Sequence, residues 1–301
     1  MDVDCTQSCY ACVEQSKVFS SPRIKTTIFV SRFGNATSVL SRTMTTTSEN
    51  DSPSLPGNCH CAAFKFSVQL QSSPGVPNAL FSCGCPLCSL NACIWAQPFA
   101  LQVLRGDVSL LKGYRNGTTL HKFCSTCGTS LLCCDAEEPP RVLFVNVRAL
   151  ADFDSSWPVI SSSCRKDAPP DALATLETSD HYRGSCCCGG ISYTLRIPPI
   201  DKTKSCNCSI CSRNGVLWTY PPVSAFAIAS GVSLAEYTFG RKQVVHAFCS
   251  TCAVPVWERF LLPAKAASMG VNVRTIHGLD YRDLPSRVHN GVATLPKYEV
   301  G

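Results

Sequence analysis

The sequence predicts a mainly β protein with little helix, made of two tandem cysteine-rich domains. Three cysteine clusters recur in the same order in the two halves of the 301-residue chain. An alternation of apolar and polar residues, typical of a half-buried strand, follows the first cluster in each half. Few segments combine helical periodicity with capping residues. The chain is long enough for two cores of ordinary size.

The clearest predicted strands begin directly after a Cys-x-Cys pair. In AAFKFSVQL, residues 62–70, every second residue from Phe64 onward is apolar. In GISYTLRI, residues 190–197, every second residue from Ile191 onward is apolar. Period-two alternation of this kind puts one face of each strand in a core and the other near solvent.

The repeat extends over most of both halves. The first half contains GNCHCAAFKFSVQL, CGCPLC, FCSTCG and LFVNVRALADFD, and the second contains GSCCCGGISYTLRI, CNCSIC, FCSTCA and MGVNVRTIHGLD. The order is preserved and the spacing drifts by only a few residues, which indicates duplication or tandem fusion. We expect an N-terminal arm at 1–52, a domain at 53–160, a linker at 161–180 and a second domain at 181–295.

Each half carries a C-x-C pair, a C-x-C-x-x-C triplet and a C-x-x-C pair. The pairs are Cys59, Cys61, Cys124 and Cys127 in the first half and Cys186, Cys188, Cys249 and Cys252 in the second. The triplets are Cys83, Cys85 and Cys88, and Cys206, Cys208 and Cys211. Zinc takes four ligands at a structural site and three protein ligands plus an open position at a catalytic site. Seven thiols per half therefore divide naturally into four and three.

Counting alone does not force this division, because another side chain can complete the triplet. His60 lies between two cysteines, where a spacer role is the simpler interpretation. His121 and His246 each precede the C-x-x-C pair by three residues, so they are candidates to support a ligand or to lie in the core. Five cysteines have no repeated partner, and packing explains them: Cys93, Cys133, Cys134, Cys164 and Cys187.

Composition narrows the function classes. The net charge of +6 is mild and no long Lys/Arg run occurs, so we expect no nucleic-acid partner. No stretch of 18 apolar residues occurs, so we expect no membrane span. Twenty-two cysteines without a secretory signal favour a reducing compartment, the cytoplasm. Residues 15–48 lack acids, as mitochondrial transit segments do, but a disordered arm is the interpretation we favour. Cys5, Cys9 and Cys12 in this arm are left unassigned.

The order G-x-C-x-C, C-x-C-x-x-C, F-C-x-x-C and V-N-V-R resembles the glutathione-dependent formaldehyde-activating (GFA) family, also called the CENP-V/GFA domain. The resemblance covers about 57–155 and 184–282. It implies a β-tent fold in each half and two zinc ions per domain, up to four per chain. It implies a closed structural zinc at each set of four pair cysteines and an open catalytic zinc at each triplet.

The activity implied by the resemblance is that of a carbon–sulfur lyase, S-(hydroxymethyl)glutathione synthase. A zinc-bound glutathione thiolate would add to formaldehyde or a related aldehyde, so the implied partners are a small thiol and an aldehyde. Arg148, Arg213 or Arg274 could meet a glutathione carboxylate, although a strand-end role is the simpler interpretation for each. The alternatives are a non-catalytic, zinc-stabilised binding module, or one active and one decayed domain.

The two halves also depart from the family pattern in different places. After the triplet, the second half has CSRNG, which is closer to the family than CSLNA in the first half. After the C-x-x-C pair, the first half has Gly128 and the second has Ala253. A glycine there would allow a positive φ, so we expect strain at Ala253.

Overall fold

The computed structural model describes residues 28–29, 53–70, 72–73, 76–77, 80–136, 140, 142–161, 180–294 and 298–299. The predicted arm and linker lie outside these residues, apart from Ile28–Phe29, Ser161 and Asp180. Cys5, Cys9, Cys12 and Cys164 lie outside them as well. The statements below concern the described part of the chain.

A mixed seven-stranded sheet forms the centre of the first half. All neighbours in it are antiparallel except the first two strands, which are parallel. The strands in spatial order are β13 (Val159–Ser161), β6 (Leu80–Ser82), β7 (Trp95–Ala96), β12 (Leu143–Asn146), β11 (Ser130–Asp135), β10 (Thr119–Phe123) and β9 (Lys112–Asn116).

The second half repeats this sheet strand for strand, again with one parallel pair at the same edge. Its strands in the equivalent order are β23 (Ser286–His289), β16 (Thr203–Cys206), β17 (Trp218–Thr219), β22 (Met269–Asn272), β21 (Pro255–Phe260), β20 (Val244–Cys249) and β19 (Leu234–Tyr237). The internal repeat of the sequence is therefore a repeat of the strand order.

A smaller sheet accompanies each large one. In the first half it consists of β2 (Ser54–Asn58), β3 (Lys65–Leu70) and β8 (Pro98–Arg105), with β1 (Ile28–Phe29) parallel to β8. In the second half it consists of β14 (His181–Ser185), β15 (Ser192–Arg196) and β18 (Phe226–Ser230). The strands predicted after each Cys-x-Cys pair are β3 and β15, and their burial alternates as expected. A two-stranded ribbon pairs β4 (Ser72–Ser73) with β5 (Val76–Pro77).

Helix is scarce, as predicted. The α-helices are α2 (Pro86–Leu90), α3 (Ser209–Asn214) and α4 (Gly291–Thr294). The 3-10 turns are η2 (Val108–Leu110), η3 (Val147–Ala149), η4 (Val223–Ala225), η5 (Pro263–Lys265) and η6 (Val273–Thr275). None of the helices in the described residues has the length and apolar character to cross a membrane. The predicted mainly β fold class is confirmed.

The V-N-V-R motif is the end of a strand and the start of a 3-10 turn. Asn146 ends β12, and its Oδ1 accepts a hydrogen bond from the Arg148 amide at 3.3 Å. Its Nδ2 donates to the Ser130 carbonyl at 3.0 Å. Asn272 makes the equivalent bonds to Arg274 and Pro255. The fully buried asparagine thereby satisfies backbone groups at the point where the sheet ends.

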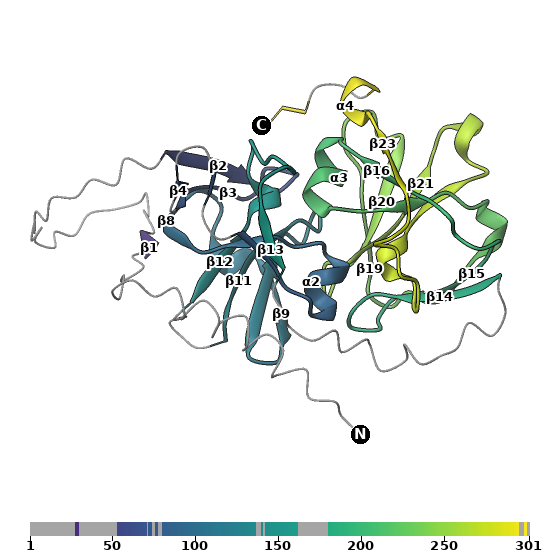
Figure 1. Ribbon diagram of the computed structural model, residues 1–301, viewed down its shortest axis with the longest axis horizontal. Coiled ribbons are helices and arrows are strands. Elements are labelled where there is room, and N and C mark those ends of the chain that lie inside the picture. Colours follow the sequence, from purple (N-terminus) through teal and green to yellow (C-terminus); the bar gives the residue numbers. More distant parts are fainter. Residues whose placement is uncertain are drawn as a thin grey trace, which may run out of the picture.

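The two halves lie side by side with α2 and α3 between them (Figure 1). Helix α3 packs on η3 of the first half, and α2 packs on η6 of the second. A Cβ built on Gly215, just after α3, would lie only 2.5 Å from the Ala92 Cβ, just after α2. One buried cluster continues from α2 and Trp95 into the strands of the second half. The halves therefore share a core and an approximate two-fold arrangement.

Arginines occupy this interface instead of a ligand site. Arg148 donates to the carbonyls of Ala92, at 2.7 Å, and of Ser212, at 3.2 Å. Arg274 donates to the Gly215 carbonyl at 3.0 Å. Burial and the nearby Arg274 charge lower the pKa of Arg148 to about 10. The strand-end interpretation therefore describes Arg148 and Arg274 better than contact with a glutathione carboxylate.

The C-x-x-C pair of each half forms a tight turn that needs a left-handed residue. The Cys124 carbonyl accepts a hydrogen bond from the Gly128 amide at 2.9 Å, and Gly128 has a φ of +71°. Ala253 takes the same place in the second half with a φ of +62°. The prediction of a positive φ at both positions is confirmed. A residue with a Cβ is strained there because the Cβ approaches the following carbonyl oxygen.

The substitution Gly128→Ala should lower the free energy of unfolding by about 2 to 4 kcal/mol. The added Cβ would be strained at this φ and would lie 2.7 Å from the Phe248 ring of the other half. Gly189→Ala is the matched control, because Gly189 has a φ of +74° but no atom within 4 Å of its Cβ position. Its cost should be about 1 kcal/mol. Urea denaturation of both variants measures the difference, and equal costs would contradict the close contact with Phe248.

Candidate metal centres

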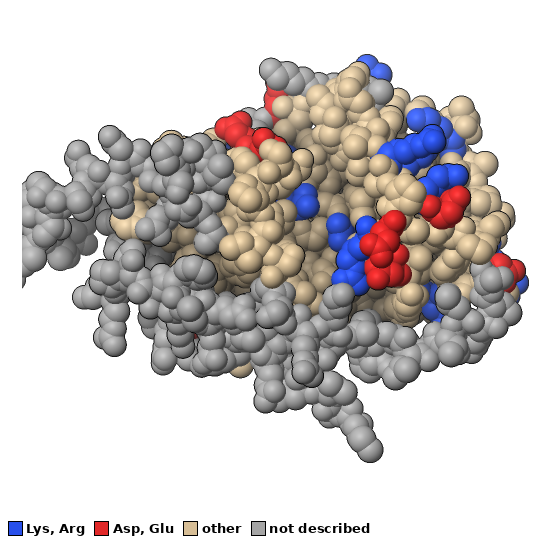
Figure 2. Space-filling view, viewed as in Figure 1, with Lys and Arg blue, Asp and Glu red and all other residues tan. Residues whose placement is uncertain are grey.

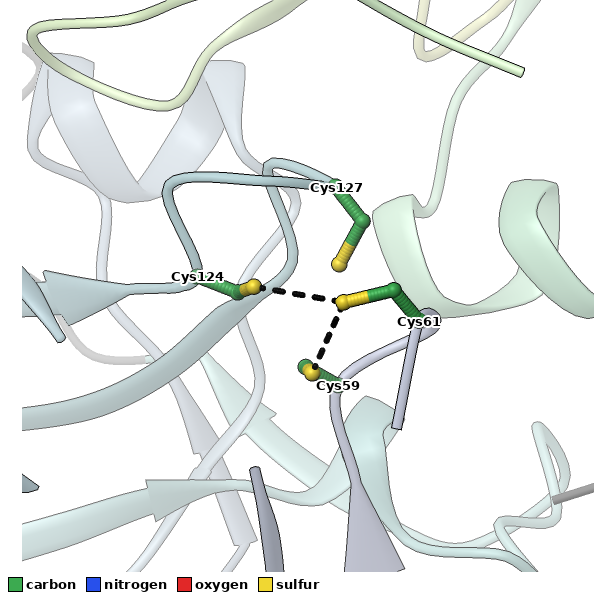
Figure 3. A group of neighbouring side chains, drawn as sticks. All are labelled: Cys59, Cys61, Cys124 and Cys127. Carbon is green, nitrogen blue, oxygen red and sulfur yellow. Dashed lines mark hydrogen bonds between the residues drawn. The ribbon is translucent and has the colours of Figure 1, made fainter. Parts of the chain in front are cut away.

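Four thiols from two distant segments meet in the first half. Cys59 and Cys61 follow β2, and Cys124 and Cys127 follow β10. Figure 3 shows the four sulfur atoms directed at a common point, and all lie within 4.8 Å of one another. The Cys61 Sγ is 3.5 Å from that of Cys59 and 3.6 Å from that of Cys124. Tetrahedral zinc with bonds of about 2.3 Å separates its sulfurs by about 3.8 Å, so the set fits a closed site.

The second half contains the same arrangement. Cys186, Cys188, Cys249 and Cys252 lie within 4.8 Å of one another. The Cys188 Sγ is 3.5 Å from both the Cys186 and the Cys249 Sγ atoms. The turns match as well, because the Cys186 amide donates to Ile191 just as the Cys59 amide donates to Phe64. Both halves can therefore hold one four-coordinate metal ion.

The triplets form two further groups, each running from the end of a strand into the first turn of α2 or α3. Cys83, Cys85 and Cys88 lie within 4.8 Å of one another, as do Cys206, Cys208 and Cys211. The middle cysteine of each triplet is the residue that precedes α2 or α3. Its amide points back to the first cysteine, at 3.4 Å in both halves. Three converging thiols leave one tetrahedral position for another ligand.

Thiols packed this closely share their protons, which prepares them to bind a cation. A hydrogen bond from Cys127 lowers the pKa of Cys124, and one from Cys186 lowers that of Cys249. A hydrogen bond from Cys208 lowers the pKa of Cys206 to about 2. Metal ligation requires the thiolate form, so one thiol in each closed set and one in the second triplet already favour the species that zinc binds.

The two triplets differ in exposure and in their neighbours. Cys83, Cys85 and Cys88 are all buried, whereas Cys206 is partly exposed. Two further cysteines interact with the first triplet. Cys93 hydrogen-bonds to Cys88, and the charges of Cys85 and Cys83 contribute to the raised pKa of Cys133. Cys93 lies beside the triplet but outside the mutual 4.8 Å group. Packing alone therefore does not describe these two cysteines, and the first triplet is a thiol-rich, closed environment.

A carboxyl group, a phenol and an imidazole lie near the second triplet, where the first triplet has further thiols. Glu258 on β21 is 5% exposed. Its Oε1 accepts a hydrogen bond from Tyr220 Oη at 3.2 Å, and its Oε2 is 3.5 Å from His246 Nδ1. A small pocket beside Cys211 is lined by Val216, Trp218, His246 and Trp257. Sequence reasoning named His246 but not Glu258 or Tyr220, because only the strand register brings them together.

His60 is a contact between the halves, which agrees with the spacer interpretation and not with a ligand role. Its Nδ1 is 2.9 Å from Tyr237 Oη and its Nε2 is 2.8 Å from Ser209 Oγ, both in the second half. Burial lowers its pKa to about 3, which keeps the ring neutral. Cys187, at the equivalent place, hydrogen-bonds to Tyr114 of the first half. Each closed site therefore touches a tyrosine of the other half.

The remaining named side chains are buried near these groups. His121 is 2% exposed, and neither ring nitrogen has a hydrogen-bond partner among the described residues. The ring lies beside Cys93 and packs edge-on against Trp95. The structure therefore places His121 in the core, one of the two positions expected from the sequence. Arg213 is also buried, and it donates to the Ser209 carbonyl at 3.0 Å and stacks on Tyr298.

Comparison with known proteins finds a family match for one part of the chain. Residues 181–288 match the family described as glutathione-dependent formaldehyde-activating enzyme. The matched range lies in the second half and includes its closed set and its triplet. A crystal structure of a Rhodobacter sphaeroides protein is similar at 26% identity, covering 35% of this chain and 99% of that chain, with a TM-score of 0.32. No curated protein matches the chain.

Metal release should occur in two phases when zinc-loaded protein is mixed with a chromogenic chelator. The closed sets surround the ion with four thiols, whereas a triplet supplies only three, and the second triplet is partly exposed at Cys206 while the first is buried, so the ion of the second triplet should leave first. Cys206→Ser should remove the fast phase. Cys83→Ser in the buried first triplet is the matched control and should keep it. Release of all metal in a single phase would contradict the distinction between open and closed groups.

Proposed function

We propose that this protein is a zinc-dependent carbon–sulfur lyase-type enzyme. The reaction that we infer is that of S-(hydroxymethyl)glutathione synthase, which joins the thiol of glutathione to formaldehyde or a related aldehyde. The observation that carries the proposal is the second triplet, three converging thiols with a partly exposed sulfur inside the segment that matches the family. We also propose the domain boundaries expected from the sequence, 53–160 and 181–295.

The donor sets fit zinc at both kinds of site, because every cluster consists of thiols whose sulfur atoms lie within 4.8 Å of one another. Cys206, Cys208 and Cys211 would hold the reactive ion, and Cys186, Cys188, Cys249 and Cys252 the structural one. The first-half clusters would hold the corresponding pair, giving up to four ions. When bound to a triplet, zinc supplies the positive charge that ionises an incoming thiol and polarises a carbonyl.

The residues around the second triplet prepare it for a small aldehyde. Trp218 and Trp257 line the pocket beside Cys211, and both are buried. Their apolar surfaces exclude water, which would otherwise compete with the thiol for the carbonyl carbon. The pocket suits a substrate of one or two carbon atoms, while the partly exposed Cys206 marks the side from which a larger thiol can approach.

Basic residues near this site favour an anionic thiol such as glutathione. Lys204 lies over the Tyr220 ring, 5.1 Å from its centroid, and Lys265 lies over Phe260 at 5.8 Å. Tyr220 and Phe260 stack on each other, so the two ammonium groups flank one aromatic pair next to Glu258. On the face shown in Figure 2, most of the Lys and Arg side chains lie over the second half. These charges can attract the carboxylates of a thiol peptide.

A second candidate is one active half supported by a decayed one. The fully buried first triplet, with Cys93 and Cys133 beside it, favours this division of roles over two equal active sites. Additional thiols next to a bound metal ion compete with the substrate thiol for the open coordination position of that ion.

The loss of a triplet ligand should abolish catalysis. We expect Cys208→Ser to reduce the rate of S-(hydroxymethyl)glutathione formation to the spontaneous rate, because two remaining thiols hold zinc poorly. Exchange NMR with ¹³C-formaldehyde and glutathione measures the rate above the uncatalysed reaction. Cys85→Ser tests the first half in the same way. If the parent is active and both single variants and the double variant keep its rate, the catalytic assignment is wrong. An inactive, fully zinc-loaded parent would favour the binding module.

A further inference from the structure

Glu258 is a buried carboxyl group with no Lys or Arg side chain within ion-pair distance among the described residues. It is 5% exposed, and its contacts are the Tyr220 hydroxyl and the His246 ring. Burial lowers the pKa of His246 to about 4, so the ring is neutral near pH 7 and gives no ion pair. A buried carboxylate without a cation destabilises a fold. A functional role would explain why the buried Glu258 carboxyl group is present despite this cost.

The sheet holds this side chain in one position. Glu258 pairs with Gly270 on the adjacent strand β22, and a Cβ on Gly270 would lie 2.7 Å from the Glu258 Cγ. The missing side chain at Gly270 makes room for the carboxyl group inside the core. On the other side, His246 on β20 is the cross-strand neighbour of Glu258. Three consecutive strands thus fix the carboxyl group, with Tyr220 above it.

The carboxyl group is bonded to two side chains that lie against the second triplet. Tyr220 packs on the cluster that contains Cys208 and Cys211, and His246 lines the small pocket beside Cys211. The charges of Cys206 and Cys211 also interact with Glu258 and with Tyr220. Burial raises the pKa of the Glu258 carboxyl to about 7, although the hydrogen bond from Tyr220 lowers it. The charged groups around Glu258 are therefore Cys206, Cys211 and, more weakly, Lys265, together with Tyr220 and His246.

In the first half, the position equivalent to Glu258 is occupied by Cys133, which has no carboxyl group. Cys133 is the cross-strand neighbour of His121, just as Glu258 is that of His246. Burial raises the pKa of Cys133, and the charges of Cys134, Cys93, Cys85 and Cys83 raise it further. Gln97, which follows Trp95–Ala96 as Tyr220 follows Trp218–Thr219, is exposed. The carboxyl group and its phenol are thus present in one half only.

We propose that Glu258 is the proton-transfer residue of the second-half site, and that this half alone carries the reaction; this inference rests on the proposed function. Glutathione and formaldehyde combine with no net change in protons. The thiol loses its proton to the Glu258 carboxylate, the sulfur forms a bond to the carbonyl carbon, and the C=O π pair becomes an alkoxide. Glu258 returns the proton to that oxygen, so the product leaves with a neutral hydroxyl group and Glu258 is a carboxylate again. Tyr220 and His246 position the carboxyl group.

The test uses Glu258→Gln, which keeps the shape and the acceptor for Tyr220 but cannot transfer a proton. We expect kcat to fall about 100-fold or more while KM for both substrates stays near the parent value. Zinc content by mass spectrometry and the unfolding midpoint should match the parent. Glu258→Asp should retain part of the activity. Formate added to Glu258→Ala should restore part of kcat, a response that a purely structural residue would not give.

Cys133→Ser is the matched control at the equivalent first-half position and should keep the parent kcat. Glu258→Gln with the parent kcat would overturn the role of Glu258 while leaving the proposed function intact. Loss of zinc from this variant would assign Glu258 a structural role and overturn it too. A parent that does not accelerate the reaction would overturn the proposed function together with this inference.

Discussion

Convergence of thiols from distant segments is the constraint on which the rest of the structure depends. In each half the pair after β2 or β14 and the pair in the turn between β10 and β11 or between β20 and β21 must meet within 4.8 Å. This closure ties the small sheet to the large one, and it needs a left-handed residue in the turn, Gly128 or Ala253. Bound metal would add its binding free energy to the stability of these small β layers.

The second constraint is the contact between the halves. Helices α2 and α3 carry the triplets, and each packs against the other half. His60 and Cys187, next to the closed sets, bond to Tyr237 and Tyr114 across the same interface. The triplets are therefore held by both halves at once. This arrangement explains why arginines that follow the V-N-V motif, Arg148 and Arg274, bond to backbone carbonyls at the interface.

Within this near-symmetric frame the two triplets have different chemistry. The first is buried among further thiols, Cys93 and Cys133, and the second has a partly exposed sulfur with a carboxyl and a phenol nearby. Duplicated domains can keep the metal-binding framework in both copies, because folding requires it, while only one copy keeps the groups that act on a substrate. The match of residues 181–288 to the GFA family falls on the copy that has these groups.

The sequence by itself determined the mainly β class, the internal repeat and the cysteine motifs of each half, because motif spacing and period-two alternation are local properties of the chain. It also placed the left-handed turn at Gly128 and Ala253. The division of these thiols into sets of four and three was decided only by the tertiary structure, which brings distant pairs together. Only the tertiary structure decided that His60 bonds across the interface and that Cys93, Cys133, Glu258 and Tyr220 lie near the triplets. These contacts depend on strand register and on packing between halves, which no short stretch of sequence encodes.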